Sequence, residues 1–538
     1  MDGATFRSLS RRRILQGMVG AAGTALLIAC GQSVQAPGTT REPGARGTQA
    51  PTAATRRGGG MVRFAWWTDV GTLTPFQVST TGPGGGVLLS LIYDTLTWKD
   101  GDGLIPWLAS EWTVAEGGRS YTFRLVEDVA WHDGKPLTAD DVKFSFDYYA
   151  KHPYRWMPTD MVASAEVTDH HEVQLRLNRP YAAFLEDIAG VVPIIPRHVW
   201  ESIPDPVKSV ASNASTGSGP FKIVAHDEAE GSYRLIANEG YWRGRPLHSE
   251  WRQLTVPAEA RVEIVRQGDA DVSLTTDASV RDLLKDHPRL DVFETAPLSL
   301  VRLAINTERP PLDQKEVRQA IAYALDRKRI AETITRGPAI VGSSGVVPPE
   351  TPWHNPSVKQ YEYNPQRARE LLGGRTYTLD LLANADAREP DLMTPMLEAV
   401  GIALKVRRVD PPTRAQILAE GDFQMALTAH IGVGGDPDYL RRWYAGEEAN
   451  AFAQGSIFQN EEYTRLGEQQ AMLLAPDQRR PVVHRMQDIL AEELPTIVLY
   501  HRRFYWVYDP KVITLMHTWG GLMNGIPFPN NKLSLIEA

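Results

Sequence analysis

Side chains that can hold a small ligand gather after two apolar stretches of the sequence. Thr68 and Asp69 follow residues 62–67, a short apolar run that predicts a strand and that contains Trp66 and Trp67. Ligands of open α/β sheets bind beyond the carboxyl ends of the strands, so these four residues are candidates for ligand contact. Core or hinge packing is the alternative for the two tryptophans, since alternation along a strand would place one inside and one outside.

A second group follows the apolar run at residues 423–429. His430 comes directly after that predicted strand, and Asp436, Asp438 and Tyr439 lie a few residues further on. An imidazole, carboxylates and a phenol can hold a polar solute through hydrogen bonds and charge. Turn and helix-capping chemistry is the alternative for the two aspartates, and simple packing is the alternative for His430.

Motifs that catalysis or metal binding would require are missing from the sequence. It contains no H-E-x-x-H motif, no paired cysteines and no close histidine cluster, so we expect no metal site. Residues 342–345 (Gly-Ser-Ser-Gly) lack the spacing of a G-x-S-x-G nucleophile motif, and no P-loop occurs. We therefore expect a protein that binds its ligand without transforming it and that carries no cofactor. An extracytoplasmic hydrolase is the competing class.

The amino-terminal residues have the features of an export signal. Residues 11–13 are arginines, a weakly apolar run of small residues spans 17–28, and Cys30 follows. That run is too short to cross a bilayer as a helix, so we interpret residues 1–29 as a signal peptide of twin-arginine type. The position of Cys30 predicts lipidation, with an ordinary buried cysteine as the alternative. Residues 30–60 are rich in Gly, Pro, Thr and Ala and predict a disordered tether.

Composition limits the partners and the source of stability. The chain has 538 residues, 42% of them hydrophobic, which is ample for the cores of two to four domains. Its single cysteine excludes an intramolecular disulfide. Loss of residues 1–29 removes four arginines and one aspartate, which takes the net charge from −8 to about −11. Such a charge argues against nucleic acid as a partner. The mature protein is expected outside the cytoplasm, held at the membrane by its lipid.

The stretch at residues 119–149 combines three local signals. Residues 121–125 alternate in the manner of a half-buried strand, and Asp133 with Gly134 predicts a turn. Thr138 followed by Asp141 predicts the start of a helix. The spacing of the apolar residues indicates the buried face of that helix, formed by Val142, Phe146 and Tyr149.

Later residues predict an alternation of helices and strands. Asp313 with Glu316 predicts another helix start, and Val317, Ile321 and Leu325 with Ala324 would form its buried stripe. Helices are expected at 364–372, 391–399 and 413–419, and strands at 377–382, 402–408 and 423–429. Successive β-α-β crossovers imply parallel strands, so the fold class is α/β.

The same residues 119–149 are similar to the signature region of the extracytoplasmic solute-binding proteins of peptide and nickel ABC importers, known as solute-binding protein family 5. The matching positions are Tyr121, Thr122, Phe123, Leu125, Val129, His132, Asp133, Gly134, Pro136, Leu137, Thr138, Ala139, Asp141, Val142, Phe144 and Ser145. Four more segments resemble sequence landmarks of the family, at residues 106–112, 217–221, 238–246 and 303–327.

The resemblance implies a periplasmic-binding-protein-like, two-lobed (class II) α/β fold with an additional inserted domain. The first domain would comprise residues 61–97, 218–300 and 508–538, the second residues 98–217, and the third residues 301–507. The ligand crevice would lie between the first and third domains, with hinge crossings near Leu300 and Tyr508. His132, Asp133 and Asp141 would then be turn and cap residues of the inserted domain, away from the crevice.

The function implied by the resemblance is solute binding for an ABC importer. Two lobes would close on a peptide or another small solute, and a monomeric lipoprotein would deliver it to permease subunits. A ligand sensor that acts on a membrane receptor is an alternative from a different class. Nickel complexes, sugars and opines are further solutes that similar proteins bind.

One departure from the family pattern concerns the ligand. In peptide binders of the family, a carboxylate in the loop after the strand at 423–429 pairs with the α-ammonium of the peptide. Without a gap, Val433 occupies that place and the carboxylate is missing; with a short gap, Asp436 takes its role. We favour its absence, because a buried ammonium without a partner is costly. The ligand would then need no free α-amine.

Overall fold

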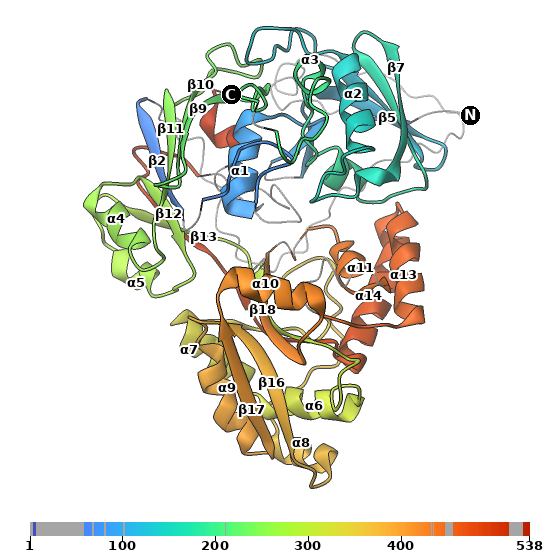
Figure 1. The fold of residues 1–538 in the computed structure, drawn as a ribbon, viewed down its shortest axis with the longest axis vertical. Helices are drawn as coiled ribbons and strands as arrows, with labels where there is room; N and C mark the ends of the chain where they lie inside the picture. Colours follow the sequence, from blue (N-terminus) through green and yellow to red (C-terminus); the bar gives the residue numbers. More distant parts are fainter. Residues whose placement is uncertain are drawn as a thin grey trace, which may run out of the picture.

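The computed structural model contains three units, each built on its own β-sheet (Figure 1). It describes residues 4–6, 59–66, 69–79, 82–100, 103–209, 211–297, 299–431, 433, 435–446, 456–515 and 531–537. Cys30 lies outside these residues, as do the predicted signal peptide apart from residues 4–6 and the predicted tether apart from residues 59–60. Within the described ranges, no helix combines the length and the apolar character needed to cross a membrane.

The first unit contains a seven-stranded mixed sheet. β2 lies near its centre, between the parallel neighbours β11 and β12, and its alternating side chains Val62, Phe64 and Trp66 are buried. In spatial order the strands are β13 (Asp291–Glu294), β20 (Tyr505–Tyr508), β12 (Val272–Thr275), β2 (Met61–Trp66), β11 (Glu250–Thr255), β10 (Ser232–Ala237) and β9 (Phe221–Asp227). The helices α1 (Gly82–Ile92), α4 (Arg261–Gln267) and α5 (Val280–Leu284) pack against this sheet and its edges.

The second, inserted unit is an antiparallel sheet covered by the helix that the sequence predicts after Thr138. That helix, α2 (Ala139–Tyr149), begins where the Asp141 carboxylate accepts a hydrogen bond from the Thr138 amide at 3.0 Å. The strands in spatial order are β1 (Ala4–Phe6), β5 (Ala109–Ala115), β6 (Ser120–Leu125), β8 (Glu172–Leu177) and β7 (Val162–Asp169). Smaller elements of this part are β3 (Thr97–Lys99), β4 (Leu104–Pro106), α3 (Arg197–Trp200), and the turns of helix at Thr159–Met161 and Phe184–Ile188.

The third unit has a six-stranded mixed sheet. β16 pairs in parallel with both β17 and β18, as the predicted β-α-β crossovers require. The strands in spatial order are β15 (Ile340–Val341), β19 (Thr496–Arg502), β14 (Ser299–Ile305), β18 (Met425–Ile431), β16 (Tyr377–Asn384) and β17 (Ile402–Val409). The helices are α6 (Lys315–Ala324), α7 (Arg327–Thr335), α8 (Pro365–Leu372), α9 (Glu389–Glu398), α10 (Pro411–Glu420), α11 (Tyr439–Tyr444), α13 (Glu461–Met472) and α14 (Pro476–Glu493).

One predicted helix start in the third unit is wrong. Asp313 does not cap α6, which begins at Lys315 with Gln314 in the N-cap position. The backbone carbonyl of Asp313 instead accepts a hydrogen bond from the buried Arg318 side chain at 3.2 Å. The predicted stripe of Val317, Ile321, Ala324 and Leu325 is fully buried, so the helical period was sufficient to find the core face even though the cap was misplaced.

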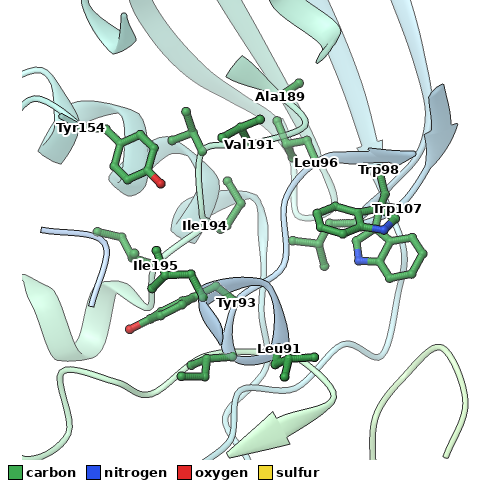
Figure 2. Packing of buried hydrophobic residues seen from close by; sticks show 14 of the residues in the cluster. Leu91, Tyr93, Leu96, Trp98, Trp107, Tyr154, Ala189, Val191, Ile194 and Ile195 are labelled. Atoms are coloured by element: carbon green, nitrogen blue, oxygen red, sulfur yellow. The ribbon is translucent and has the colours of Figure 1, made fainter. Parts of the chain in front are cut away.

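A buried carboxylate joins several of the family-like segments. Asp94 accepts hydrogen bonds from Trp107 Nε1 at 2.7 Å, Tyr241 OH at 3.0 Å and Ser218 Oγ at 3.1 Å. Its ion-pair partner is Lys532, at 2.6 Å, and both side chains are fully buried. The ammonium of Lys532 lies over the indoles of Trp98 and Trp107, which Figure 2 shows side by side in the core. Asp94 therefore ties the inserted unit and the carboxyl-terminal segment to the first unit.

The signature histidine fastens the chain where it returns to the first unit. His132 Nδ1 accepts a hydrogen bond from the Gly217 amide at 3.2 Å, and its Nε2 donates to the Gly219 carbonyl at 3.0 Å. A Cβ atom at Gly217 would lie 1.9 Å from the Ile92 carbonyl oxygen, so only glycine fits there. Burial lowers the pKa of His132 to about 4, because the charged imidazolium would lose its hydration.

Replacing His132 tests whether this buried, neutral imidazole, which we call the His132 clamp, makes stability depend on pH. The folded state resists protonation of His132 until about pH 4 and the unfolded chain binds that proton near pH 6.5, so stability is lost as pH falls between these values. Between pH 7 and pH 4.5 the free energy of unfolding should therefore fall by about 2 kcal/mol less in His132→Asn than in the wild type. Guanidinium denaturation at the two pH values measures this difference. His170→Asn, at an exposed histidine, is the control. Equal pH dependence in the wild type and His132→Asn would contradict the clamp.

Candidate ligand-binding site

Asp69 organises the loop that follows β2. Its carboxylate accepts hydrogen bonds from the Gly71 amide at 2.8 Å and from the Tyr233 hydroxyl, and it lies 3.1 Å from His226 Nε2. The rings of His226 and Tyr233 stack with centroids 4.3 Å apart. Burial alone would raise the pKa of Asp69, but the hydrogen bonds from Tyr233 and Gly71 outweigh it and lower the pKa. The carboxylate is therefore ionised and shapes the loop around it.

The structure describes one of the two tryptophans that precede this loop. Trp66 is the last residue of the strand, and its ring lies 5.6 Å from that of Phe64 within the core of the first unit. It is buried, with 1% of its surface exposed. Trp67 and Thr68, the other two predicted ligand residues here, lie outside the described residues. Trp66 thus takes the inward position that alternation allots to one of the two tryptophans.

His430 lies at the end of β18, beside a buried arginine. Its Nε2 is 2.7 Å from Arg302 Nη2, and its ring stacks on Trp443 with centroids 4.2 Å apart. Arg302 also donates to the hydroxyls of Tyr444 at 2.5 Å and Ser456 at 3.0 Å. Burial lowers the pKa of Arg302, since its guanidinium is removed from water. His430 therefore belongs to a dense polar cluster inside the third unit.

Val433 and Tyr439 lie in the core next to that cluster. Both are 1% exposed, and they share a hydrophobic cluster with Leu300, Leu440 and Trp443. The rings of Tyr439 and Trp443 are 4.9 Å apart. Burial raises the pKa of Tyr439 well above its usual value, so the phenol stays protonated. These contacts support a packing role, and a ligand role for either residue stays a prediction.

Asp436 is held by an arginine of α14. Its two carboxylate oxygens lie 2.5 and 2.6 Å from Arg479 Nη1 and Nη2, a bidentate ion pair that is almost fully buried. Asp436 also accepts a hydrogen bond from the Asp438 amide at 2.8 Å, which closes the turn. Asp436 is the residue that takes the amine-binding position if the alignment with the family contains a short gap. Its charge is already neutralised by Arg479, a side chain of its own unit.

Asp438 is the most enclosed of the predicted site residues. Its carboxylate has no exposed surface and accepts hydrogen bonds from Arg441 Nε at 2.8 Å, Gln470 Nε2 at 2.6 Å and Tyr181 OH at 2.9 Å. Burial would raise the pKa of Asp438, but the guanidinium groups of Arg441 and Arg442 hold it well below its ordinary range. Tyr181 comes from the inserted unit, so Asp438 also links two units.

A cavity of about 420 Å³ lies elsewhere in the third unit. It is bounded by the start of α7, by β15 and by residues 349–363, with Ser343, His354 and Tyr363 on its wall. None of the predicted ligand residues lines it. Within the described residues, no group of three or more histidine, cysteine or acidic side chains is arranged to hold a metal ion.

The structure brings the predicted residues together in two groups. Asp69 makes its contacts within the first unit, whereas His430, Val433, Asp436, Asp438 and Tyr439 share one region at the β18–α11 junction of the third unit. Sequence reasoning missed Arg302 and Arg479. A signal for Arg302 was present, because it is the single charged residue in the apolar strand β14, whose seven residues are all buried. Arg479 offered none, since it lies among several charged residues of α14.

Comparison of the sequence with known proteins identifies a family and relatives within it. The model of the bacterial extracellular solute-binding proteins, family 5, matches residues 103–452. Heme-binding protein A of Haemophilus influenzae is 27% identical over 447 residues, which cover 76% of this chain and 80% of that protein. The dipeptide-binding protein of Escherichia coli is also 27% identical, over 62% of this chain and 69% of its own length.

Solved structures agree in fold. The periplasmic binding protein DppA of Helicobacter pylori, in complex with the peptide STSA, superposes with a TM-score of 0.76 at 21% identity, covering 88% of this chain and 99% of its own. NikZ of Campylobacter jejuni, in complex with Ni(L-His), gives a TM-score of 0.76 at 20% identity, covering 89% and 99%. At this level of identity the likeness shows the architecture alone.

Two arginines of α14 test how much the buried pairing of Asp436 contributes. Replacing Arg479 with glutamine leaves Asp436 buried without its cation, which should lower the free energy of unfolding by about 3–5 kcal/mol. Arg485 on the same helix pairs with Glu462 at the surface, so Arg485→Gln should cost less than about 1 kcal/mol. Guanidinium denaturation measures both values. Equal losses in the two variants would show that the Asp436 pair contributes no more than a surface ion pair.

Proposed function

The chain belongs to family 5 of the bacterial extracellular solute-binding proteins, and on that premise we propose that it is the solute-binding component of an ABC importer. It binds a peptide or another small solute outside the cytoplasm and presents it to the permease. The observation that carries this proposal is the family match, which runs from residue 103 in the inserted unit, through strands β9 to β13 of the first unit, to residue 452 in the third. The α/β, two-lobed fold predicted from sequence is confirmed by the solved relatives.

Binding in such a protein is a conformational process. The first unit with the inserted unit forms one lobe and the third unit forms the other, and closure buries the solute between them. The loop at Asp69 and the segment from His430 to Tyr439 are the parts of the two lobes that we assign to solute contact. Within the described residues, the turns at 69–71 and 436–438 are each closed by a backbone amide that donates to an aspartate, which lowers the cost of ordering these turns on binding.

The class of solute follows from the carboxylates of the third unit. Val433 is packed in the core, Asp436 is paired with Arg479, and Asp438 is paired with Arg441. An ammonium that approached this turn would have to compete with a guanidinium for either carboxylate. We therefore propose that the solute is recognised without a charged α-amine, as an N-blocked peptide or a non-peptide solute would be.

Three further features complete the proposal. The mature protein begins at a lipidated Cys30, so its inserted sheet starts at β5 and lacks β1. It acts as a monomer and reaches the permease on the tether of residues 31–60. We propose a division into three domains. The first comprises residues 61–97, 218–300 and 508–538, the second residues 98–217, and the third residues 301–507. A return of the chain to the first domain near its end is supported by β20 (Tyr505–Tyr508), which joins the first sheet, although this strand begins three residues before the proposed boundary at 508.

The solute itself provides the test. Denaturing mass spectrometry of small molecules released from the purified mature protein should yield a compound without a free α-amine. In calorimetric titrations, tri-alanine and N-acetyl-tri-alanine should differ in affinity by less than about threefold, because no ion pair with the ammonium is lost on acetylation. Recovery of peptides with free amino termini, or a loss of more than about a hundredfold on acetylation, would overturn the proposed solute class.

A further inference from the structure

A buried cluster of charges connects the inserted unit to the third unit. It consists of Tyr181 and Asp187 from the inserted unit and of Asp438, Arg441 and Arg442 from the third. Tyr181 OH lies 2.9 Å from Asp438 Oδ2 and 3.3 Å from Asp187 Oδ2, so the hydroxyl sits between the two carboxylates. Arg442 Nη2 lies 3.6 Å from Asp187 Oδ2. These side chains are 0–14% exposed.

Further contacts surround this cross-unit cluster. The Ala182 amide donates a hydrogen bond to the Ala471 carbonyl of α13 at 2.7 Å. Arg179 forms an ion pair with Glu468 at the rim, where both side chains are about one-third exposed. In Figure 1, α11 and α13 are the parts of the third unit drawn nearest to the inserted unit. The interface is therefore polar at its centre as well as at its edge.

The path of the chain makes this interface separable. The inserted unit is connected covalently to the first unit at both of its ends, and the third unit is connected to the first unit near residues 295–297 and 503–504. These two crossings are joined by hydrogen bonds between Thr295 and Phe504, in which the Thr295 amide donates to the Phe504 carbonyl at 2.9 Å and the Phe504 amide to Thr295 Oγ1 at 2.9 Å. Rotation of the third unit about this paired crossing would break the two contacts of the cluster that join the units, Tyr181 to Asp438 and Arg442 to Asp187.

We propose that the cross-unit cluster is a proton-linked latch, in which closure of the lobes buries Asp187 against Arg442 and Tyr181 and takes up a proton under mildly acidic conditions. The latch holds the closed form through the protein's own side chains, independently of solute. This inference rests on the proposed function, since it concerns the closing movement of the two lobes. It adds a control by pH that solute binding alone would not provide.

The charges around Asp187 give the direction of the effect. Burial raises the pKa of Asp187 to about 6, against the opposing influence of Arg442 and Lys99, while Asp436 and Glu186 add to the rise. In the proposed open form the third unit no longer covers Asp187, so water reaches the carboxylate and its pKa falls back toward the ordinary 3.8. A group whose pKa is higher in the closed form stabilises that form below pH 6 and loses this contribution as pH rises through 6. Acid therefore favours closure.

The distance between the lobes can be measured directly. Lys151 and Gln366 are exposed positions on the inserted and third units. Spin labels attached to Lys151→Cys and Gln366→Cys in a Cys30→Ala background report closure by pulsed electron–electron double resonance. The mature chain is first freed of solute by unfolding in guanidinium chloride and refolding. From pH 7.5 to pH 5.0 the ratio of closed to open molecules should rise about tenfold. An unchanged or falling ratio would overturn the latch.

Variants separate the latch from general effects of acid. Asp187→Asn should give a ratio at pH 7.5 at least equal to that of the wild type at pH 5.0, with no further change on acidification. Asp140→Asn, at an exposed carboxylate of the same unit, should keep the wild-type rise. Retention of the rise in Asp187→Asn, or its loss in Asp140→Asn, would assign the pH response to other groups and overturn the proposal.

The hydroxyl of Tyr181 supplies a second, pH-independent test. Tyr181→Phe removes the bridge between Asp187 and Asp438 and should lower the closed-to-open ratio about tenfold at both pH values. If circular dichroism shows that this variant does not fold, Glu468→Gln at the exposed rim should lower the ratio about threefold. No decrease in the folded variant would overturn the latch. Because solute is absent throughout, these outcomes are independent of whether the released solute lacks an α-amine.

Discussion

The buried pair of Asp94 and Lys532 fixes how the inserted unit and the carboxyl-terminal segment pack on the first unit. A carboxylate fully removed from water is costly unless its oxygens are paired, and Asp94 is satisfied only when separate parts of the chain converge on it. Trp107, Ser218 and Tyr241 reach it from three stretches of sequence, and Lys532 reaches it from the carboxyl-terminal segment. Displacing any one of these segments would leave a donor or a charge unpaired, so the inserted unit has one compatible position on the first.

This convergence explains why the sequence landmarks were informative about the family but not about the solute. The segments at 106–112, 217–221 and 238–246 each contribute a donor to Asp94 or a glycine that permits close backbone approach. His132 fastens the crossing at Gly217 and Gly219 in the same manner. These residues maintain the body of the protein, and they leave the solute-binding loops free to differ.

Local patterns predicted much of the fold because their signals act over a few residues. Asn364 caps α8 by accepting a hydrogen bond from the Arg367 amide, Gly373 ends it with φ of 60°, and the alternation in β6 matches its burial. Long-range pairings escaped prediction. Sequence spacing could not show that Arg479 would meet Asp436, 43 residues away, or that Tyr181 would meet Asp438, 257 residues away. For that reason the sequence left open which partners the carboxylates of the turn at 436–438 would find. They pair with Arg479 and Arg441, and contact of this turn with solute stays a prediction.

We propose that a solute binds between the two lobes, in contact with the loop at Asp69 and with the segment that begins at His430. A crystal structure of the mature protein, purified with the solute that it carries from its native host, tests this most directly. We expect electron density for the solute between the first and third units, with Asp436 still paired to Arg479. Density confined to the cavity beside Ser343 and Tyr363, or an Asp436 carboxylate released from Arg479 to bind the solute, would contradict it.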